Sequence, residues 1–317
     1  MIEHNVAKKG HELERDVSAP ATATGAPTRG SMRGELRKAL LLIPSVLLIL
    51  CFSYYPAVRA VVGSFTQWNG FNAPVFVGFQ NYVSYVTSST FGVEMRNICI
   101  LFIGGILASI VFPFIGAELL NGLPNGRAQT VIKYLFVIPL AIPQVVLIYI
   151  WANLLNPNTG MVDALLSLAH VSPIQWFSGP RTALLSILLI GFPWISQLSF
   201  LILLAGLQSI EKDIRDAAMI DGIGAFARVF KIDIPMIMSQ IQFVVVISGI
   251  GIVQNIVPIL LLTNGGPGNA TMVPGFDMYE SAFQYNELGY GMAIGTLLFV
   301  AMMAVTLIVL RVFRART

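Results

Sequence analysis

The chain has 317 residues, of which 56% are hydrophobic and only 11% carry a charged side chain. Soluble domains carry about 25% charged residues, so this composition excludes an ordinary soluble domain and indicates an integral membrane protein. The formal net charge of +3 does not indicate a nucleic-acid partner, because the basic residues mostly flank apolar segments.

The N-terminal residues 1–38 are rich in Ala, Thr, Gly, Pro and charged side chains. They hold too few apolar residues to pack a core, so we expect a disordered tail. The apolar run that begins at Ala39 continues to about Phe65 without a small-residue cleavage signal, which is too long for the apolar region of a signal peptide. We therefore expect a retained first membrane span and a division into a tail, 1–38, and a membrane domain, 39–317.

Six apolar stretches are long enough to cross a bilayer, which takes about 20 residues of helix. They are residues 39–63, 98–120, 131–155, 182–206, 236–262 and 291–311. The sequence thus predicts an all-α integral membrane protein with six transmembrane helices.

The basic residues predict how these helices are oriented. If the N-terminus is cytoplasmic, 16 of the 19 Lys and Arg residues lie on the cytoplasmic side, and only Arg59, Arg96 and Arg181 lie outside. Lys and Arg are enriched in cytoplasmic loops. We therefore expect both termini, and the loop 207–235, to be cytoplasmic.

The segment 207–235 is the longest charged stretch inside the apolar C-terminal half, so it must lie in water between two spans. Ser209 can cap a helix, and acids in the first turn suit the helix dipole. Gly222 and Gly224 then let the chain turn, and the small residues of this segment let another protein approach the backbone closely. An amphipathic helix lying on the lipid surface is the alternative interpretation.

This segment also carries a spaced motif: Asp216-Ala217-Ala218, three residues, Gly222, nine residues, and then Ile232, one residue, and Ile234-Pro235. It resembles the signature loop of the membrane subunits of ABC-type importers, E-A-A, three residues, G, nine residues, I-x-L-P, with Asp and Ile in place of Glu and Leu. The resemblance implies a coupling loop held by a separate ATPase subunit. The residues that it assigns to this coupling are Asp216, Ala217, Ala218, Asp221, Gly222, Ile232 and Pro235.

Several motifs in the predicted outer loops resemble sugar-specific ABC permeases of the maltose and multiple-sugar type. The motifs are Ser64-Phe65-Thr66-x-Trp68-Asn69, Val77-Gly78-x-x-Asn81-Tyr82, Leu155-Asn156-Pro157, Leu262-Thr263-Asn264-Gly265-Gly266-Pro267-Gly268 and Leu288-Gly289-Tyr290-Gly291. This resemblance extends over about residues 39–314 and implies the ABC importer permease fold. Taken alone, the aromatic residues also suit an interfacial belt.

Polar side chains inside two predicted spans are candidates for a substrate pathway. Unsatisfied polar groups cost several kcal/mol in the bilayer, so these residues need partners, which could be other helices or a passing polar solute. Neutral amides beside an aromatic ring suit a sugar, whose hydroxyls need donors and acceptors and whose C–H faces need a ring. The candidates are Trp194, Gln197, Ser248, Gln254 and Asn255.

The chain lacks the phosphate-binding loop G-x-x-x-x-G-K-[ST], because no Lys is followed by Ser or Thr. We therefore expect no cofactor in this chain, with ATP and Mg²⁺ held by partner ATPase subunits. Cys51 and Cys99 stand inside apolar stretches, and the three histidines lie outside the spans, so neither a disulfide framework nor a metal site is indicated.

The resemblance implies a permease subunit that imports a sugar or oligosaccharide across the cell membrane and is not itself an enzyme. It further implies a second, homologous permease, two ATPase subunits and an extracellular solute-binding protein as partners. An ion-coupled secondary carrier is the alternative, but such carriers place ionisable residues near the bilayer centre, and 99–117, 184–205 and 237–263 contain none. An intramembrane hydrolase would need a His, Asp or Cys constellation within the spans, and the sequence shows none.

Overall fold

A computed structural model describes residues 32–124, 126–194 and 196–312 of the chain. The predicted tail falls mostly on residues 1–31, which lie outside the described range. The chain divides into two compact units, residues 1–56 and 57–317. The first helical stretch consists of α1 (Met32–Ile49), the π-helical turn η1 (Leu50–Tyr54) and α2 (Tyr55–Gly63).

After the end of α2, the second unit continues with a short pair of strands and with α4, the longest helix of the described residues. A short antiparallel pair of strands joins Thr66 to Phe76 and Gln67 to Val75. The elements up to residue 168 are β1 (Thr66–Gln67), β2 (Val75–Phe76), α3 (Gln80–Val86), α4 (Phe91–Asn121), α5 (Arg127–Val137), the 3₁₀ turn η2 (Ile138–Ala141), α6 (Gln144–Leu154) and α7 (Met161–Leu168).

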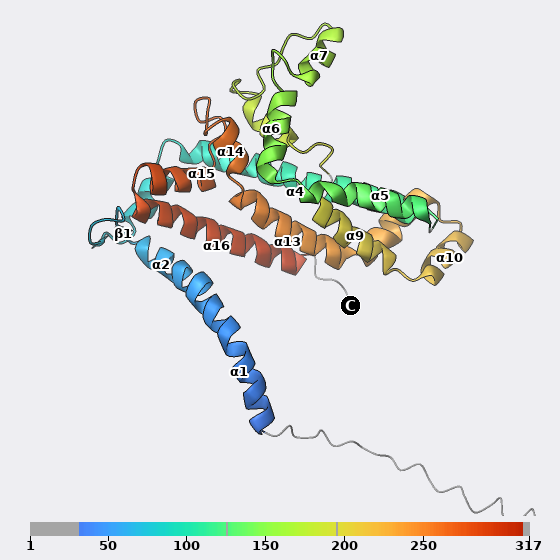
Figure 1. Ribbon diagram of the computed structural model, residues 1–317, viewed down its shortest axis with the longest axis horizontal. Coiled ribbons are helices and arrows are strands. Elements are labelled where there is room, and N and C mark those ends of the chain that lie inside the picture. The colour runs from blue at the N-terminus through green and yellow to red at the C-terminus, as the bar shows by residue number, and fades with distance from the viewer. Residues whose placement is uncertain (1–31, 125, 195, 313–317) are drawn as a thin grey trace, which may run out of the picture. The chain divides into compact units, whose positions relative to one another are not determined.

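The C-terminal half adds shorter helices before the last long one. Its elements are α8 (Ala183–Leu189), α9 (Gln197–Gln208), α10 (Lys212–Ile220), α11 (Ala225–Arg228), the π-helical turn η3 (Val229–Asp233), α12 (Ile234–Met236), α13 (Met238–Gln254), α14 (Val257–Leu262), α15 (Pro274–Tyr279), the π-helical turn η4 (Glu280–Gln284) and α16 (Leu288–Val312). Helices α4, α9, α13 and α16 run side by side in Figure 1, with α9 and α16 each against α13.

Four helical segments in the described part of the chain are long and apolar enough to cross a membrane: Leu40–Gly63, Phe91–Asn121, Met238–Leu262 and Leu288–Val312. They correspond to the first, second, fifth and sixth predicted spans. The chain is therefore a multi-pass membrane protein whose structure is almost entirely helical. The two remaining predicted spans take a different form.

The third predicted span is bent and the fourth is interrupted. Arg127–Ala141 and Gln144–Leu154 meet at 97°, at the prolines that remove backbone donors from the helical ladder. The fourth stretch forms α8 and α9, and the residues between them include Gly191 and Trp194 with positive φ values of 89° and 55°. An L-residue with left-handed backbone cannot continue an α-helix. Of the six predicted transmembrane helices, the described residues thus form four that are long enough to span a membrane, or five if the bent pair is one span.

The core gathers where α4, α9 and α13 pack on one another. Large side chains on all three helices are fully buried there, among them Leu120, Phe200, Leu203 and Ile237. Inside a bilayer, where lipid tails are as apolar as Leu, these side chains stabilise the bundle through van der Waals packing between the helices. This packing sets the position of the helix ends that carry the segment 207–235.

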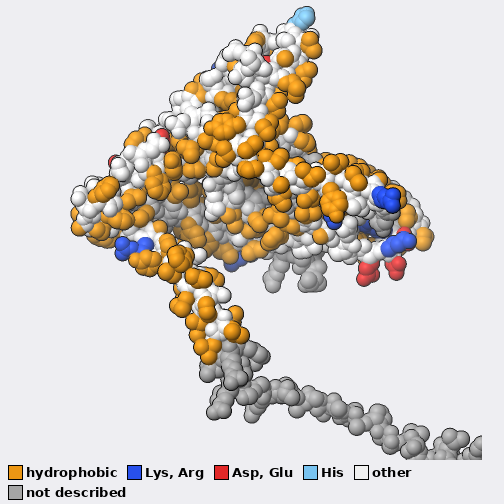
Figure 2. Space-filling view, in the orientation of Figure 1, with side chains coloured by type: hydrophobic (Ala, Val, Ile, Leu, Met, Phe, Trp, Pro, Cys, Tyr) orange, Lys and Arg blue, Asp and Glu red, His pale blue; other side chains and the backbone are white. Residues whose placement is uncertain are grey.

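Most of the remaining surface is apolar. Figure 2 shows hydrophobic side chains over the face that it presents, while acidic and basic side chains gather together at the end where α10 lies. A soluble monomer rarely exposes so continuous an apolar surface. The distribution is that of a chain surrounded by lipid, with its charged side chains gathered near α10.

Candidate coupling surface and membrane cavity

Helix α10 forms the first half of the predicted coupling loop. Asp213 stands in its first turn, where the helix dipole favours a negative charge. The predicted capping role of Ser209 is not seen: Glu211 is the N-cap residue, and the Ser209 hydroxyl donates to the Gly206 carbonyl, 2.7 Å away, at the end of α9. Ser209 therefore ends one helix rather than beginning the next.

Gly222 ends α10 with a left-handed residue, φ 72°. The Gly222 N–H donates to the Met219 carbonyl at 3.1 Å, and the Ile223 N–H donates to the Ala218 carbonyl at 3.0 Å. These two bonds form a Schellman motif, which favours glycine at this position. A Cβ added to Gly222 would meet no atom within 4 Å, so the space outside this turn is open.

The outer side of this loop exposes apolar side chains to water. Ile220 is 86% exposed, Phe226 78% and Met219 63%. Exposed apolar clusters on a hydrated segment mark interaction sites. Helices that bind lipid surfaces are rich in Lys and Arg on their polar face, whereas 207–235 holds four basic and five acidic residues. The surface suits a protein partner better than a lipid headgroup layer.

The inner side of the loop is held by an ion-pair cluster, Glu118–Arg228–Asp233. Arg228 donates from Nη2 to Glu118 Oε1 at 2.5 Å and from Nε to Asp233 Oδ2 at 2.9 Å. The Asp233 side chain is fully buried, and the Glu118 side chain is 15% exposed. Glu118 lies in the last turn of α4. The cluster therefore joins the loop to a helix that is far away in the sequence.

Arg215 adds a second link between the loop and the same end of α4. Its Nη2 donates to the Leu207 carbonyl at 2.7 Å and lies 3.8 Å from Asp233 Oδ1. In the amide orientation that satisfies both partners, the Asn121 oxygen accepts from both Nη atoms of Arg215, at 2.6 and 2.8 Å. Burial lowers the pKa of Arg228, but its hydrogen bonds to Asp233 and Glu118 outweigh burial and raise that pKa above its usual value.

The predicted coupling residues divide into two groups. Asp216, Ala217 and Ala218 lie in α10, where Ala217 is exposed and Ala218 packs inward. Ile232 and Pro235 lie in η3 and α12, half-buried and exposed respectively. The structure therefore places the motif on both arms of one turn, with Asp221 and Gly222 exposed at its bend.

A cavity of about 340 Å³ lies among α4, α6, α8, α9 and the junction of α13 with α14. Three of the predicted pathway residues, Trp194, Gln197 and Asn255, line it. Asn255 stands where α13 ends, with φ −84° and ψ 89°, before α14 begins at Val257. Irregular backbone at membrane depth is tolerated where it faces a cavity.

Trp194 is fixed at the wall of this cavity by its own contacts. Its Nε1–H donates to the Leu188 carbonyl at 2.7 Å. Its ring packs against Phe112 and Phe192, with centroids 5.0 and 4.8 Å away. The indole donor is thus satisfied within the chain, and the ring supplies an apolar platform rather than a hydrogen bond.

The other two predicted pathway residues lie elsewhere. Gln254 lines a separate, largely apolar cavity of about 580 Å³ between α13 and α16, and Ser248 is not among the residues lining either cavity. Successive helical residues point about 100° apart, so Gln254 and Asn255 face different sides although they are adjacent. Gln254 and Asn255 therefore do not line the same cavity, although they are adjacent in the sequence.

Three polar residues at the 340 Å³ cavity were missed by the sequence analysis. They are Ser109 in α4, Gln144 at the start of α6 and Ser196 before α9. Gln144 had a detectable signal, because it is a lone amide in the apolar run that follows Pro143. All the side chains that line this cavity are electrically neutral.

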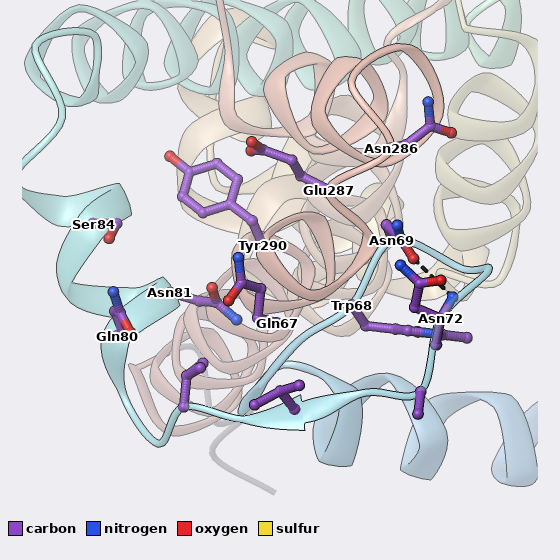
Figure 3. Close-up of a pocket in the computed structure, with 13 residues that line it drawn as sticks. Gln67, Trp68, Asn69, Asn72, Gln80, Asn81, Ser84, Asn286, Glu287 and Tyr290 are labelled. Atoms are coloured by element: carbon purple, nitrogen blue, oxygen red, sulfur yellow. Dashed lines mark hydrogen bonds between the residues drawn. The ribbon is translucent and has the colours of Figure 1, made fainter.

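The outer-loop motifs build a second polar pocket, of about 550 Å³. Figure 3 shows Trp68, Gln80 and Tyr290 around it, from the segment after β1, α3 and α16. Several motif residues are used to fold the loop: Asn81 Nδ2 donates to the carbonyls of Ser64 and Thr66, both at 2.9 Å. These strands and α10 lie at opposite ends of the long helices (Figure 1).

No group of three or more His, Cys, Asp or Glu side chains is placed to hold a metal ion within residues 32–312, leaving aside positions 125 and 195. The arrangement instead combines an exposed apolar surface on the loop 207–235, a cavity with a neutral lining and a polar pocket around Trp68.

Comparison with known proteins identifies relatives of this arrangement. The chain is 30% identical over 289 residues to a trehalose/maltose transport system permease protein of Thermococcus litoralis, covering 87% of this chain and 93% of the relative. It is 29% identical over 285 residues to a sulfoquinovosyl glycerol transport system permease protein of Agrobacterium fabrum, covering 89% and 92%.

A solved bacterial ABC transporter involved in the import of the acidic polysaccharide alginate has the same fold in one of its chains. Its TM-score is 0.76 at 22% identity, covering 90% of this chain and 97% of that one. Residues 117–317 match the family model described as "Binding-protein-dependent transport system inner membrane component". That match takes in the coupling loop and most of the cavity, and the chain therefore belongs to this family of inner-membrane transport components.

Proposed function

We propose that the chain is the membrane subunit of an ABC importer that carries a neutral sugar or oligosaccharide into the cell. The observation that carries this proposal is the loop 207–235, whose outer side exposes Ile220 and Phe226 and whose inner side is anchored on α4. A chain with no phosphate-binding loop of its own and a hydrated apolar surface needs a separate motor. ATP and Mg²⁺ then belong to that partner.

The chemistry of the 340 Å³ cavity supports a neutral cargo. Its amides and hydroxyls can donate to and accept from sugar hydroxyls, and Trp194 offers a ring face to sugar C–H groups. The lining has no cation that would pair with an acidic sugar or a phosphate. The relative named for trehalose/maltose agrees with a neutral sugar cargo. The relative named for a sulfoquinovosyl glycerol agrees only with a glycoside, because that sugar carries an anionic sulfonate.

We assign the remaining partners to the two opposite ends of the long helices. We assign the end with 207–235 to the cytoplasm, together with both termini, on the distribution of Lys and Arg. The outer pocket around Trp68 then faces the side from which an extracellular solute-binding protein approaches. A second, homologous permease completes the pathway, and two ATPase subunits take one coupling loop each, so that alternating access is a rocking of two halves about a central site.

Purification followed by vesicle reconstitution tests this function. We expect mild-detergent purification of the tagged chain to recover a second permease and an ATPase subunit. Vesicles holding that complex should accumulate a neutral disaccharide only with ATP on the loop side and the binding protein on the other. A protonophore should leave the rate unchanged. Accumulation by the chain alone, driven by an ion gradient, would instead establish a secondary carrier.

A further inference from the structure

The loop 207–235 is joined covalently only to α9 and α13, yet its strongest polar contacts lead to α4. Arg228 bridges Glu118 at 2.5 Å and Asp233 at 2.9 Å, and Arg215 reaches the Asn121 amide of the same helix end. Glu118 and Arg228 are 110 residues apart in the chain. The cluster is therefore a tertiary contact and does not follow from the loop's own folding.

Burial makes this contact costly to break. Asp233 is fully buried, and the Glu118 and Arg228 side chains are 15% and 24% exposed. Ion pairs with little solvent access are screened much less than surface pairs. Removing one partner of such a pair leaves a buried charge without compensation. Movement of Arg228 with the loop would therefore pull the end of α4 along.

Helix α4 connects this contact to the cavity. It is continuous from Phe91 to Asn121, and Gly105, Ala108 and Ser109 on it line the 340 Å³ cavity. About 14 Å of helix separates Ser109 from Glu118. A displacement applied at Glu118 therefore reaches the cavity wall through one packed helix.

We propose that the Glu118–Arg228–Asp233 cluster is a positioning device that delivers the movement of the coupling loop to α4, and hence to the cavity wall. This inference rests on the proposed function, in which 207–235 engages an ATPase. It adds a route through α4, a helix that contacts the loop but is not joined to it directly in the sequence. Arg is required at the centre because its planar fork reaches both carboxylates, which the single ammonium of Lys cannot do in the same geometry.

The test is the number of sugar molecules imported per ATP hydrolysed by the reconstituted complex. We expect Glu118→Gln to lower this ratio at least tenfold while the ATPase subunit still co-purifies and still hydrolyses ATP. Arg228→Lys should give an intermediate ratio. Gln129→Ala is the matched control, because it removes a neutral hydrogen bond, to the Leu120 carbonyl, from the same end of α4 and should leave the ratio unchanged.

The outcomes separate this inference from the proposed function. An unchanged ratio in Glu118→Gln overturns the inference alone. A loss of ATPase co-purification in step with transport would also overturn it, because the cluster would then only keep the loop folded. Absence of any ATPase from the wild-type complex would overturn the proposed function, and this inference with it.

A chemical cross-link covers the case in which Glu118→Gln fails to fold. Glu118→Cys combined with Arg228→Cys, with Cys51 and Cys99 changed to Ser, removes the ion pair and allows a short bifunctional thiol reagent to replace it. We expect a low import-to-ATP ratio before cross-linking and at least a fivefold recovery after it. No recovery in cross-linked, folded protein would overturn the inference.

Discussion

Replacing Gly222 with tryptophan is expected to abolish ATPase binding and transport while the membrane domain stays folded. Gly222 has φ 72°, and a Cβ there meets no atom of the chain within 4 Å. The ring would therefore project into the docking surface rather than into the core. Left-handed backbone costs a non-glycine residue about 1–2 kcal/mol, and an overpacked contact costs about 1–3 kcal/mol more. Together these terms amount to about 2–5 kcal/mol, which lowers affinity by roughly thirtyfold to several thousandfold.

Co-purification of the ATPase and ATP-driven uptake measure this effect. Gly268→Trp is the matched control, since Gly268 also has positive φ, 56°, and open space around its Cβ position. It lies in the loop between α14 and α15, away from 207–235, and should retain the ATPase. Normal ATPase association in Gly222→Trp would show that this turn is not the docking surface.

The double variant Gln197→Leu with Asn255→Leu is expected to reduce sugar uptake by about tenfold to a hundredfold. Both amides line the neutral cavity, and each hydrogen bond to a bound sugar contributes about 0.5–1.5 kcal/mol. Leucine keeps the bulk of the side chain but offers neither donor nor acceptor. Initial uptake rates in reconstituted vesicles at saturating ATP measure the loss, with ATPase association as the check on folding.

Gln254→Leu is the matched control for this double variant. Gln254 is the immediate neighbour of Asn255 but lines the other cavity, against α16. Uptake by this variant should stay within about twofold of the wild type, because Gln254 does not line the 340 Å³ cavity. An equal loss in Gln254→Leu and in the double variant, or no loss in either, would remove the 340 Å³ cavity from the sugar pathway.

The uninterrupted spans could be predicted from the sequence, whereas the broken ones could not. Apolar length suffices for Phe91–Asn121 and Leu288–Val312, because each forms one continuous helix, the first of them with Pro113 inside it. Residues 182–206 are just as apolar, but Trp194 adopts a left-handed conformation, and hydropathy carries no information about backbone dihedrals. The third predicted span is bent by 97° beside Pro139 and Pro143, an angle that hydropathy does not give.

At the candidate sites, features that depend on neighbouring residues could be predicted from the sequence, whereas contacts between distant segments could not. The turn at Gly222 could be predicted because its signal is local, and Gly222 has a left-handed φ of 72°. The pairing of Glu118 with Arg228 could not be predicted, because the two residues are 110 positions apart in the chain. Likewise Ser109 and Gln144 meet at the cavity only because α4 and α6 do.

Site-directed cross-linking from position 220 tests the central claim most directly. Ile220→Cys, in a chain with Cys51 and Cys99 changed to Ser, places a thiol on the most exposed apolar residue of the loop, 86% exposed in the wild type. We expect a membrane-impermeant bifunctional reagent, applied to the cytoplasmic side, to cross-link this position to an ATPase subunit. Gly222→Trp should prevent this cross-link. Labelling of position 220 only from the outer side, or cross-links that never include a nucleotide-hydrolysing chain, would contradict the account.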